Sequence, residues 1–178
     1  MSSLESRCLE SFPDWLRTLP GDASALALLL EVSEVDVLVY SCVRALTYLS
    51  KSLDLIPDGL EELGYIDDAF VLRVAAASVP EAERATDPSG TLPKLASEAE
   101  LIREFLAEDY ERLEAFVEGL ASASARGRSV EEASTNPEAR AALANDVRAW
   151  AESYQSPGFS RDQKNLVKLR SFMKNKLP

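Results

Sequence analysis

The sequence predicts an all-α fold, a single compact helical bundle of about six to seven helices. Apolar residues recur at helical spacing through most of the 178-residue chain, in which 46% of residues are hydrophobic and 28% are charged. Prolines and glycines fall in short groups between these helical patterns, where they indicate turns. The chain is long enough to bury a core, and it lacks the run of about eighteen apolar residues that a transmembrane segment needs.

The first half of the chain predicts helices separated by prolines. Pro13 and Pro20 interrupt the apolar pattern, so we expect the chain to leave the helical path at both. Asp22 and Ser33 each precede an apolar run and are expected to cap it. The run after Ser33 is apolar on most sides; its β-branched residues also suit a strand, but its period near 3.6 favours a central helix. These patterns predict helices over residues 2–12, 23–32 and about 34–50, with a single turn over 14–19.

The second half alternates helical patterns with turn-forming segments. Asp67 or Asp68 is expected to cap the next helix, Pro137 suits the first turn of a later one, and Ser160 is expected to cap the last. The predicted helices cover residues 69–79, 95–121, 137–155 and 161–176, joined by a loop at 80–93 and a polar linker at 122–136. We therefore expect three parts: a helical core (1–90), a helical extension packed on it (91–158) and a basic amphipathic helix (159–178).

Composition excludes several classes of function. The chain contains no histidine, which removes Ser-His and Cys-His catalysis and imidazole metal sites. Its two cysteines, Cys8 and Cys42, lie among apolar residues and are expected to be buried thiols. The net charge of −11 comes from 19 basic and 30 acidic residues, and such an acidic body repels nucleic acid. We identify no catalytic residue and do not expect an enzyme.

The most distinctive stretch is the acidic motif of residues 48–68. It places Asp54, Asp58, Asp67 and Asp68 around Pro57 and Gly64. The favoured interpretation is structural: Pro57 turns the chain, Asp54 or Asp58 caps a short helix that Gly64 ends, and Asp67 and Asp68 cap the next helix. Arg44 and Arg73, on otherwise apolar helices, are the expected partners of buried carboxylates.

A metal site is the alternative interpretation of the same aspartates. Carboxylate oxygens are the ligands that Mg²⁺ and Ca²⁺ prefer, so Asp54, Asp58, Asp67 and Asp68 together form a candidate set. Their spacing does not match an EF-hand loop, and the positive ends of two helices would compete with a cation. No other cofactor is expected.

The motif also resembles a known family. Tyr48-Leu49, the run from Asp54 to Asp58, and the run from Leu63 to Asp68 are similar to the signature of the YkvA-like domain, a bacterial family of unknown function. The resemblance covers about residues 34–79 and leaves the rest of the chain unexplained. It implies a small helical domain, often associated with membranes, with no established reaction. Ser52, Gly59 and Glu61-Glu62 depart from the family pattern, so the connecting turn is expected to be looser or more helical here.

The last twenty residues form the second candidate site. They carry six basic residues and one acidic residue. On a helix, apolar and basic side chains fall largely on different sides, and such a helix can lie on an anionic membrane or dock in a partner groove. The competing interpretation is that it folds back on the acidic body. The residues expected to make the membrane or partner contact are Lys164, Leu166, Lys168, Leu169, Phe172 and Met173.

These observations favour a non-enzymatic helical interaction or regulatory protein that binds a protein partner or forms a homo-oligomer. One alternative is a protein with an acidic cluster that binds a divalent metal and has hydrolytic activity. The other is a peripheral membrane protein attached weakly, and in a salt-sensitive way, through residues 159–178. Because the first residues lack the basic and apolar regions of a signal peptide, we expect a cytoplasmic location, peripheral to the membrane if the last helix binds it.

Overall fold

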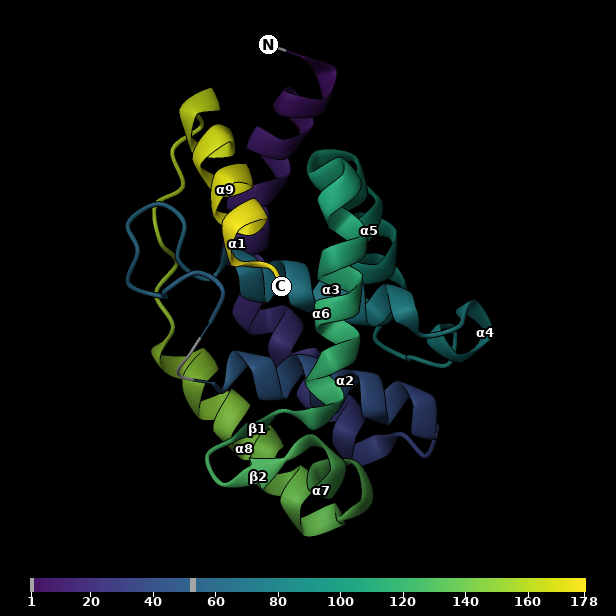
Figure 1. The fold of residues 1–178 in the computed structure, drawn as a ribbon. Coiled ribbons are helices and arrows are strands. Elements are labelled where there is room, and N and C mark those ends of the chain that lie inside the picture. The colour runs from purple at the N-terminus through teal and green to yellow at the C-terminus, as the bar shows by residue number, and fades with distance from the viewer. Residues whose placement is uncertain (1, 52–53) are drawn as a thin grey trace.

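A computed structural model describes residues 2–51 and 54–178 and confirms the all-α prediction. Ser52, where the sequence departs from the family pattern, lies outside the described residues. Nine α-helices and one two-stranded hairpin occur in the part of the chain described (Figure 1). The helices are α1 (Ser3–Val32), α2 (Asp36–Leu49), α3 (Ile66–Ser78), α4 (Glu81–Arg84), α5 (Thr91–Leu106), α6 (Tyr110–Gly119), α7 (Val130–Thr135), α8 (Pro137–Ser153) and α9 (Gln163–Lys176).

Helix α1 is continuous, so the predicted interruptions at its prolines are wrong. Pro13 and Pro20 both lie inside the helix, which begins at a capping box formed by Ser2 and Glu5. The local cost of a proline is outweighed because residues on both sides of each proline bury one apolar face. Asp22 consequently lies in mid-helix and does not cap one. Ser33 does not cap α2 either, since Val35 occupies that position.

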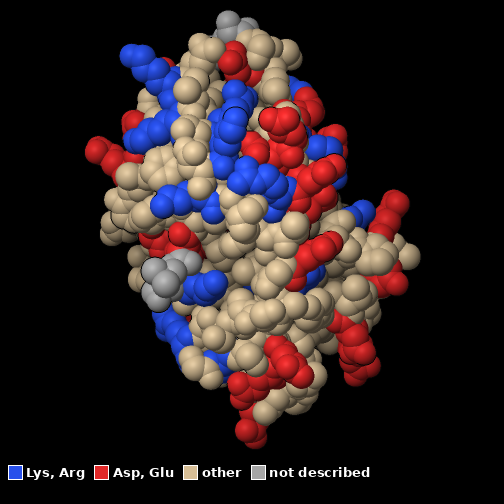
Figure 2. Space-filling model, in the orientation of Figure 1, with Lys and Arg blue, Asp and Glu red and all other residues tan. Residues whose placement is uncertain are grey.

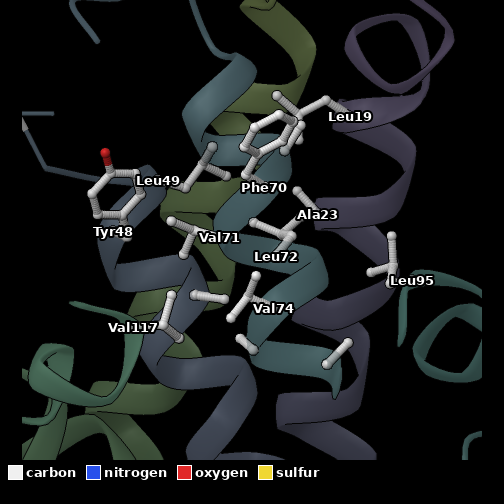
Figure 3. Close-up of a cluster of buried hydrophobic side chains, with 14 of the residues drawn as sticks. Leu19, Ala23, Tyr48, Leu49, Phe70, Val71, Leu72, Val74, Leu95 and Val117 are labelled. Carbon is white, nitrogen blue, oxygen red and sulfur yellow. The ribbon is translucent and has the colours of Figure 1, made fainter. Parts of the chain in front are cut away.

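Helix α3 runs through the centre of the core. Every residue from Ile66 to Ala76 is buried, and the helix packs against α1, α2, α5 and α6. Figure 3 shows Phe70, Val71, Leu72 and Val74 of α3 pointing to different sides, between Tyr48 and Leu49 of α2 and Leu19 and Ala23 of α1. Because α3 is buried on all sides, its charged residues Asp67, Asp68 and Arg73 also lie in the core.

The long helix predicted over residues 95–121 is broken. Ala107 adopts φ 51° and ψ −120°, and a 3₁₀ turn (η1, Ala107–Asp109) separates α5 from α6. Across the bend, Arg103 donates a hydrogen bond to Glu114 at 3.2 Å and lies over the ring of Tyr110. The sequence has no glycine or proline at this bend. The helical spacing of its apolar residues continues across the bend, which is why one unbroken helix was predicted.

The predicted linker at 122–136 contains regular structure. After a second 3₁₀ turn (η2, Leu120–Ser122), strands β1 (Ser124–Ala125) and β2 (Arg128–Ser129) pair around a turn at Arg126 and Gly127, both with positive φ. Ser129 then caps α7. The helix predicted from Pro137 is confirmed as α8, whereas α9 is capped by Asp162 and not by Ser160.

Buried apolar residues from α1 through to Leu177 form one connected core. Across the described chain, none of the helices has the length and apolar character required to cross a membrane.

Candidate functional site

Residues 54–65, the described part of the segment before α3 and here called the acidic turn, form a series of tight turns and not the short helix predicted there. Leu60 N–H donates to the Pro57 carbonyl at 2.9 Å, and Gly64 N–H donates to the Leu60 carbonyl at 2.8 Å. Leu55, Ile56 and Leu63 are buried and fix these turns to the core. Pro57 is exposed at the outer edge, where its missing N–H costs nothing.

Gly64 has a different role from the predicted one. It was expected to end a helix, but a Cβ on Gly64 would lie 2.1 Å from the backbone carbonyl oxygen of Asp58. The residue is therefore needed for a close approach between two backbone segments. The left-handed conformation belongs to its neighbours Glu62 (φ 69°) and Tyr65 (φ 66°), where it costs about 1–2 kcal/mol per non-glycine residue.

Tyr65 joins this turn to α8. Its ring lies 6.0 Å from that of Trp150 and 5.1 Å from that of Tyr154, both in edge-on geometry. The hydroxyl of Tyr154 in turn donates to the carbonyl of Leu16 in α1 at 2.7 Å. The sequence alone gives no sign that Trp150 and Tyr154 contact the motif.

Asp67 closes the turn onto α2. Its Oδ2 accepts hydrogen bonds from the Tyr48 hydroxyl at 2.5 Å and from the Ile56 N–H at 3.1 Å. Tyr48 in turn accepts the N–H of Leu55 at 2.8 Å. Burial, followed by the nearby Asp67 charge, raises the pKa of Tyr48, so the tyrosine stays a hydrogen-bond donor. The sequence pointed to Tyr48 only as part of the family motif.

Three other carboxylates converge beside Asp67. One oxygen each from Asp54, Asp58 and Asp68 lies within 4.8 Å of the other two, although the residues come from both ends of the turn. Asp68 is only 1% exposed. Within the described atoms, Asp54 Oδ1, Asp58 Oδ1, Asp67 Oδ1 and Asp68 Oδ2 are all buried without a hydrogen-bond partner.

This arrangement contradicts the capping interpretation of Asp67 and Asp68. They occupy the first turn of α3, where the cap position is held by Tyr65 and no described side chain makes a cap hydrogen bond. Their carboxylates still benefit from the positive end of the helix. That interaction does not satisfy the orphaned oxygens, because each buried carboxylate oxygen needs a donor or a cation.

The electrostatics of the cluster follow from burial and like charge. Burial, with the charges of Asp58 and Asp67, raises the pKa of Asp54 to about 8. Burial raises the pKa of Asp67 to about 6, although Tyr48 and Ile56 oppose this by stabilising the ionised form. The pKa of Asp68 rises well above its usual range through burial and then through its three acidic neighbours, and burial also raises that of Asp58. The cluster must take up protons or a cation near neutral pH.

The two predicted arginine partners lie elsewhere. Arg44 donates to the Ser78 hydroxyl at 3.1 Å and lies over the ring of Tyr40. Arg73 points to the other side of α3, where its Nε donates to Glu98 at 2.8 Å. The prediction that these arginines neutralise the aspartates is wrong, because an all-buried helix directs residues on successive turns to different neighbours.

The last helix is docked, which overturns most of the predicted membrane or partner contact. Leu166, Leu169 and Met173 are buried in the chain's own core, and Phe172 is half-buried. Lys164 and Lys168 remain exposed. Figure 2 shows basic side chains over the upper part of this face, where α9 lies, with acidic side chains beside them. The helix therefore uses its apolar side for folding.

The fold and site together define a helical protein with a carboxylate-lined turn between α2 and α3. Residues 40–73 match the family described as "Protein of unknown function (DUF1232)", which confirms the family resemblance for that segment. The matched segment runs from α2 through the acidic turn into α3 and contains all four aspartates. No curated protein and no solved structure matches the chain.

Proposed function

We propose that the acidic turn is a divalent-cation site and that the protein acts by binding rather than by catalysis. The observation that carries the proposal is the set of four buried carboxylate oxygens without hydrogen-bond partners among the described residues, on Asp54, Asp58, Asp67 and Asp68. Three of these residues already bring oxygens within 4.8 Å of one another. Like charges held this close in a buried site are unfavourable unless protons or a cation balance them.

The four carboxylates have unequal parts in the proposed site. Asp54, Asp58 and Asp68 would bind the cation directly. Asp67 is held by Tyr48 and Ile56 through Oδ2, which leaves Oδ1 as the oxygen that faces away from those donors. Tyr48 is thus a positioning residue that holds Asp67 and the start of the turn together.

Ca²⁺ fits this ligand set better than Mg²⁺. Ca²⁺ accepts about six to eight oxygens in flexible geometry, whereas Mg²⁺ requires a near-ideal octahedron and keeps several of its waters. A cation bound to Asp68 must lose water on that side, since this residue is 1% exposed. The cation would also fix the turn between α2 and α3, which is the regulatory role we assign to it.

Cation titration of the metal-stripped full-length chain tests this proposal. We expect saturable heat with Ca²⁺, a weaker response to Mg²⁺, and a melting temperature that rises with cation concentration as ligand linkage requires. Asp68→Asn should abolish both responses, while Asp36→Asn, at an exposed position in the first turn of α2, should retain them. Absence of heat and of thermal stabilisation at millimolar Ca²⁺, Mg²⁺ and Mn²⁺ would refute it.

A second candidate function is self-association through an apolar surface. Leu28 and Val32 are 49% and 58% exposed, and their spacing places them on one face of α1. Val37, in the first turn of α2, is 40% exposed. Exposed apolar side chains grouped in this way support an interaction role. Sedimentation analysis should show a concentration-dependent oligomer that Val32→Glu weakens, and a monomer at all concentrations would argue against this role.

A further inference from the structure

A groove of about 460 Å³ lies on the other side of Tyr48 from the acidic turn. One wall is formed by α6, with Ala115, Phe116 and Gly119, and the other by Lys51 after α2 and by Pro178. Figure 1 shows α6 and the C-terminal end together at the front of the molecule. The ring of Phe116 contacts that of Tyr48 edge-on at 5.7 Å, so the groove has a rigid aromatic floor. Its volume is typical of a site for a small molecule.

The charge of the groove is opposite to that of the protein. Its described lining includes Lys51 and Arg112 and no acidic residue, in a chain with 30 acidic and 19 basic residues. Most of the exposed surface of the groove is apolar, supplied by residues such as Ala115 and Phe116. An apolar floor with a positive edge is complementary to a molecule that has an apolar body and one negative group.

The two cations of the groove are not equivalent. Arg112 already donates to the carbonyls of Lys174, Leu177 and Pro178 and pairs with Asp109, so its guanidinium caps the end of α9. Lys51 is half-buried and has no ion-pair partner among the described residues. Its charge acts on Asp54, whose pKa it lowers against the effect of burial. Lys51 is therefore the group able to bind an incoming anion.

We propose that this groove binds a small amphipathic carboxylate, with its carboxylate on the Lys51 ammonium and its alkyl chain over Phe116 and Leu120. A lysine that pairs with a carboxylate beside an apolar surface gains a charge-assisted hydrogen bond in a partly dehydrated setting. The alkyl chain covers apolar surface that is otherwise in contact with water. This site uses a different set of residues from the cation site, although the charge of Lys51 also acts on Asp54.

Gly119 provides a direct way to fill the groove. It has helical backbone angles (φ −63°, ψ −16°), and a Cβ built on it meets no atom within 4 Å. Gly119→Leu should therefore fold normally, since a residue with a side chain replaces a helical glycine at no steric cost. Its side chain would occupy the space assigned to the alkyl chain.

Octanoate is the probe, titrated into the isotope-labelled full-length chain in EDTA, with backbone amide shifts and the melting temperature as readouts. We expect saturable shifts confined to residues around Gly119 and Ala123, weaker binding of 1-octanol, and none of octylammonium. Lys51→Gln should weaken octanoate binding about tenfold, and Gly119→Leu should abolish it. Lys168→Gln, an exposed lysine on α9, is the matched control and should leave the affinity unchanged.

Several results would overturn the proposal. One is the absence of saturable shifts with octanoate at its solubility limit. Others are equal affinities for octanoate and 1-octanol, unchanged affinity in Lys51→Gln, or unchanged affinity in a folded Gly119→Leu variant. Because all titrations are done without divalent cations, none of these outcomes reports on cation binding by the acidic turn.

Discussion

Helix α3 has buried ionisable groups on two sides. One group combines both signs of charge, and the other is acidic throughout. On one side, Arg73 is fully buried between Glu98, at 2.8 Å, and Asp22, at 3.8 Å, while Lys94 pairs with Asp22 at 2.6 Å. The guanidinium also lies 4.0 Å from the centre of the Trp15 ring. On the other side, Asp54, Asp58, Asp67 and Asp68 bring four charges of the same sign together.

The difference shows which group has its charge balanced within the chain, even though Arg73 Nη2 is, like the aspartate oxygens, buried without a hydrogen-bond partner among the described atoms. In the Arg73 network, burial lowers the pKa to about 10, with Glu98 and Asp22 opposing that change, so the arginine remains charged at neutral pH. Its charge and those of its partners balance each other. The aspartate cluster is only partly satisfied, by Tyr48 and Ile56 at Asp67 and by a side-chain hydrogen bond between Asp54 and Asp58. Under the proposed function it is the group that a cation from outside the chain completes, and substitutions in the two groups should change stability with opposite signs.

The largest effect is expected from Arg73→Met. Removing the cation leaves Glu98 without its main partner and Asp22 with Lys94 as its remaining ion pair, which should reduce the free energy of unfolding by about 3–5 kcal/mol. Urea denaturation measures the loss. Arg17→Met, which removes an exposed pair with Asp14, should change stability by less than about 1 kcal/mol. Similar stabilities for the two variants would show that the Arg73 network contributes little.

Gly64→Ala should be nearly as damaging, since its Cβ would lie 2.1 Å from the Asp58 carbonyl oxygen. Relieving that overlap means opening the turn, and we expect a loss of about 3 kcal/mol together with loss of the cation response. Gly21→Ala is the control: it meets no atom within 4 Å inside α1 and should be neutral or slightly stabilising. Equal effects at both glycines would contradict the proposed close approach.

Asp68→Asn should act in the opposite direction from Arg73→Met. Without divalent cations at pH 8, the neutral amide removes one like charge and can donate to an orphaned oxygen, so stability should increase by about 1 kcal/mol. With Ca²⁺ the wild type should gain stability and the variant should not. A variant that is destabilised without cations would show that the cluster is already satisfied within the chain.

A further effect is that of pH on the cation-free protein. The raised pKa values of Asp67, about 6, and Asp54, about 8, mean that the folded chain holds more protons than the unfolded chain between about pH 4 and pH 8. The stabilisation from this difference is complete below the ordinary aspartate value near 4 and is lost as pH rises through about 6 and then 8. Melting temperatures in EDTA should therefore fall from pH 5 to pH 8.5, and saturating Ca²⁺ should offset the fall at the alkaline end. A rise over the same range in EDTA would contradict it.

The helical period in the sequence predicted the fold class well, and it failed where tertiary packing overrode local signals. Pro13 and Pro20 are strong breaking signals, but burial along α1 outweighs them. Ala107 carries no breaking signal, yet Arg103, Tyr110 and Glu114 stabilise a bend there. In both cases the deciding contacts join residues whose pairing cannot be read from the local sequence pattern.

The candidate site could be located from the sequence but not understood from it. The aspartates and Gly64 were identified by the motif, and their grouping was considered among the alternatives. Capping was favoured because aspartates near helix ends usually cap them. The sequence could not reveal that Tyr65 adopts φ 66° and takes the cap position, which turns Asp68 toward Asp54 and Asp58. It also could not show that α3 is buried on all sides, which directs Arg73 away from the cluster.

The most direct test of the cation proposal is an anomalous-scattering crystal structure of the full chain with Mn²⁺, an oxygen-preferring ion that is visible at its absorption edge. The account predicts one anomalous peak between Asp54, Asp58 and Asp68, within about 2.5 Å of an oxygen of each. An empty cluster at saturating Mn²⁺, with the carboxyls hydrogen-bonded to one another through shared protons, would contradict it.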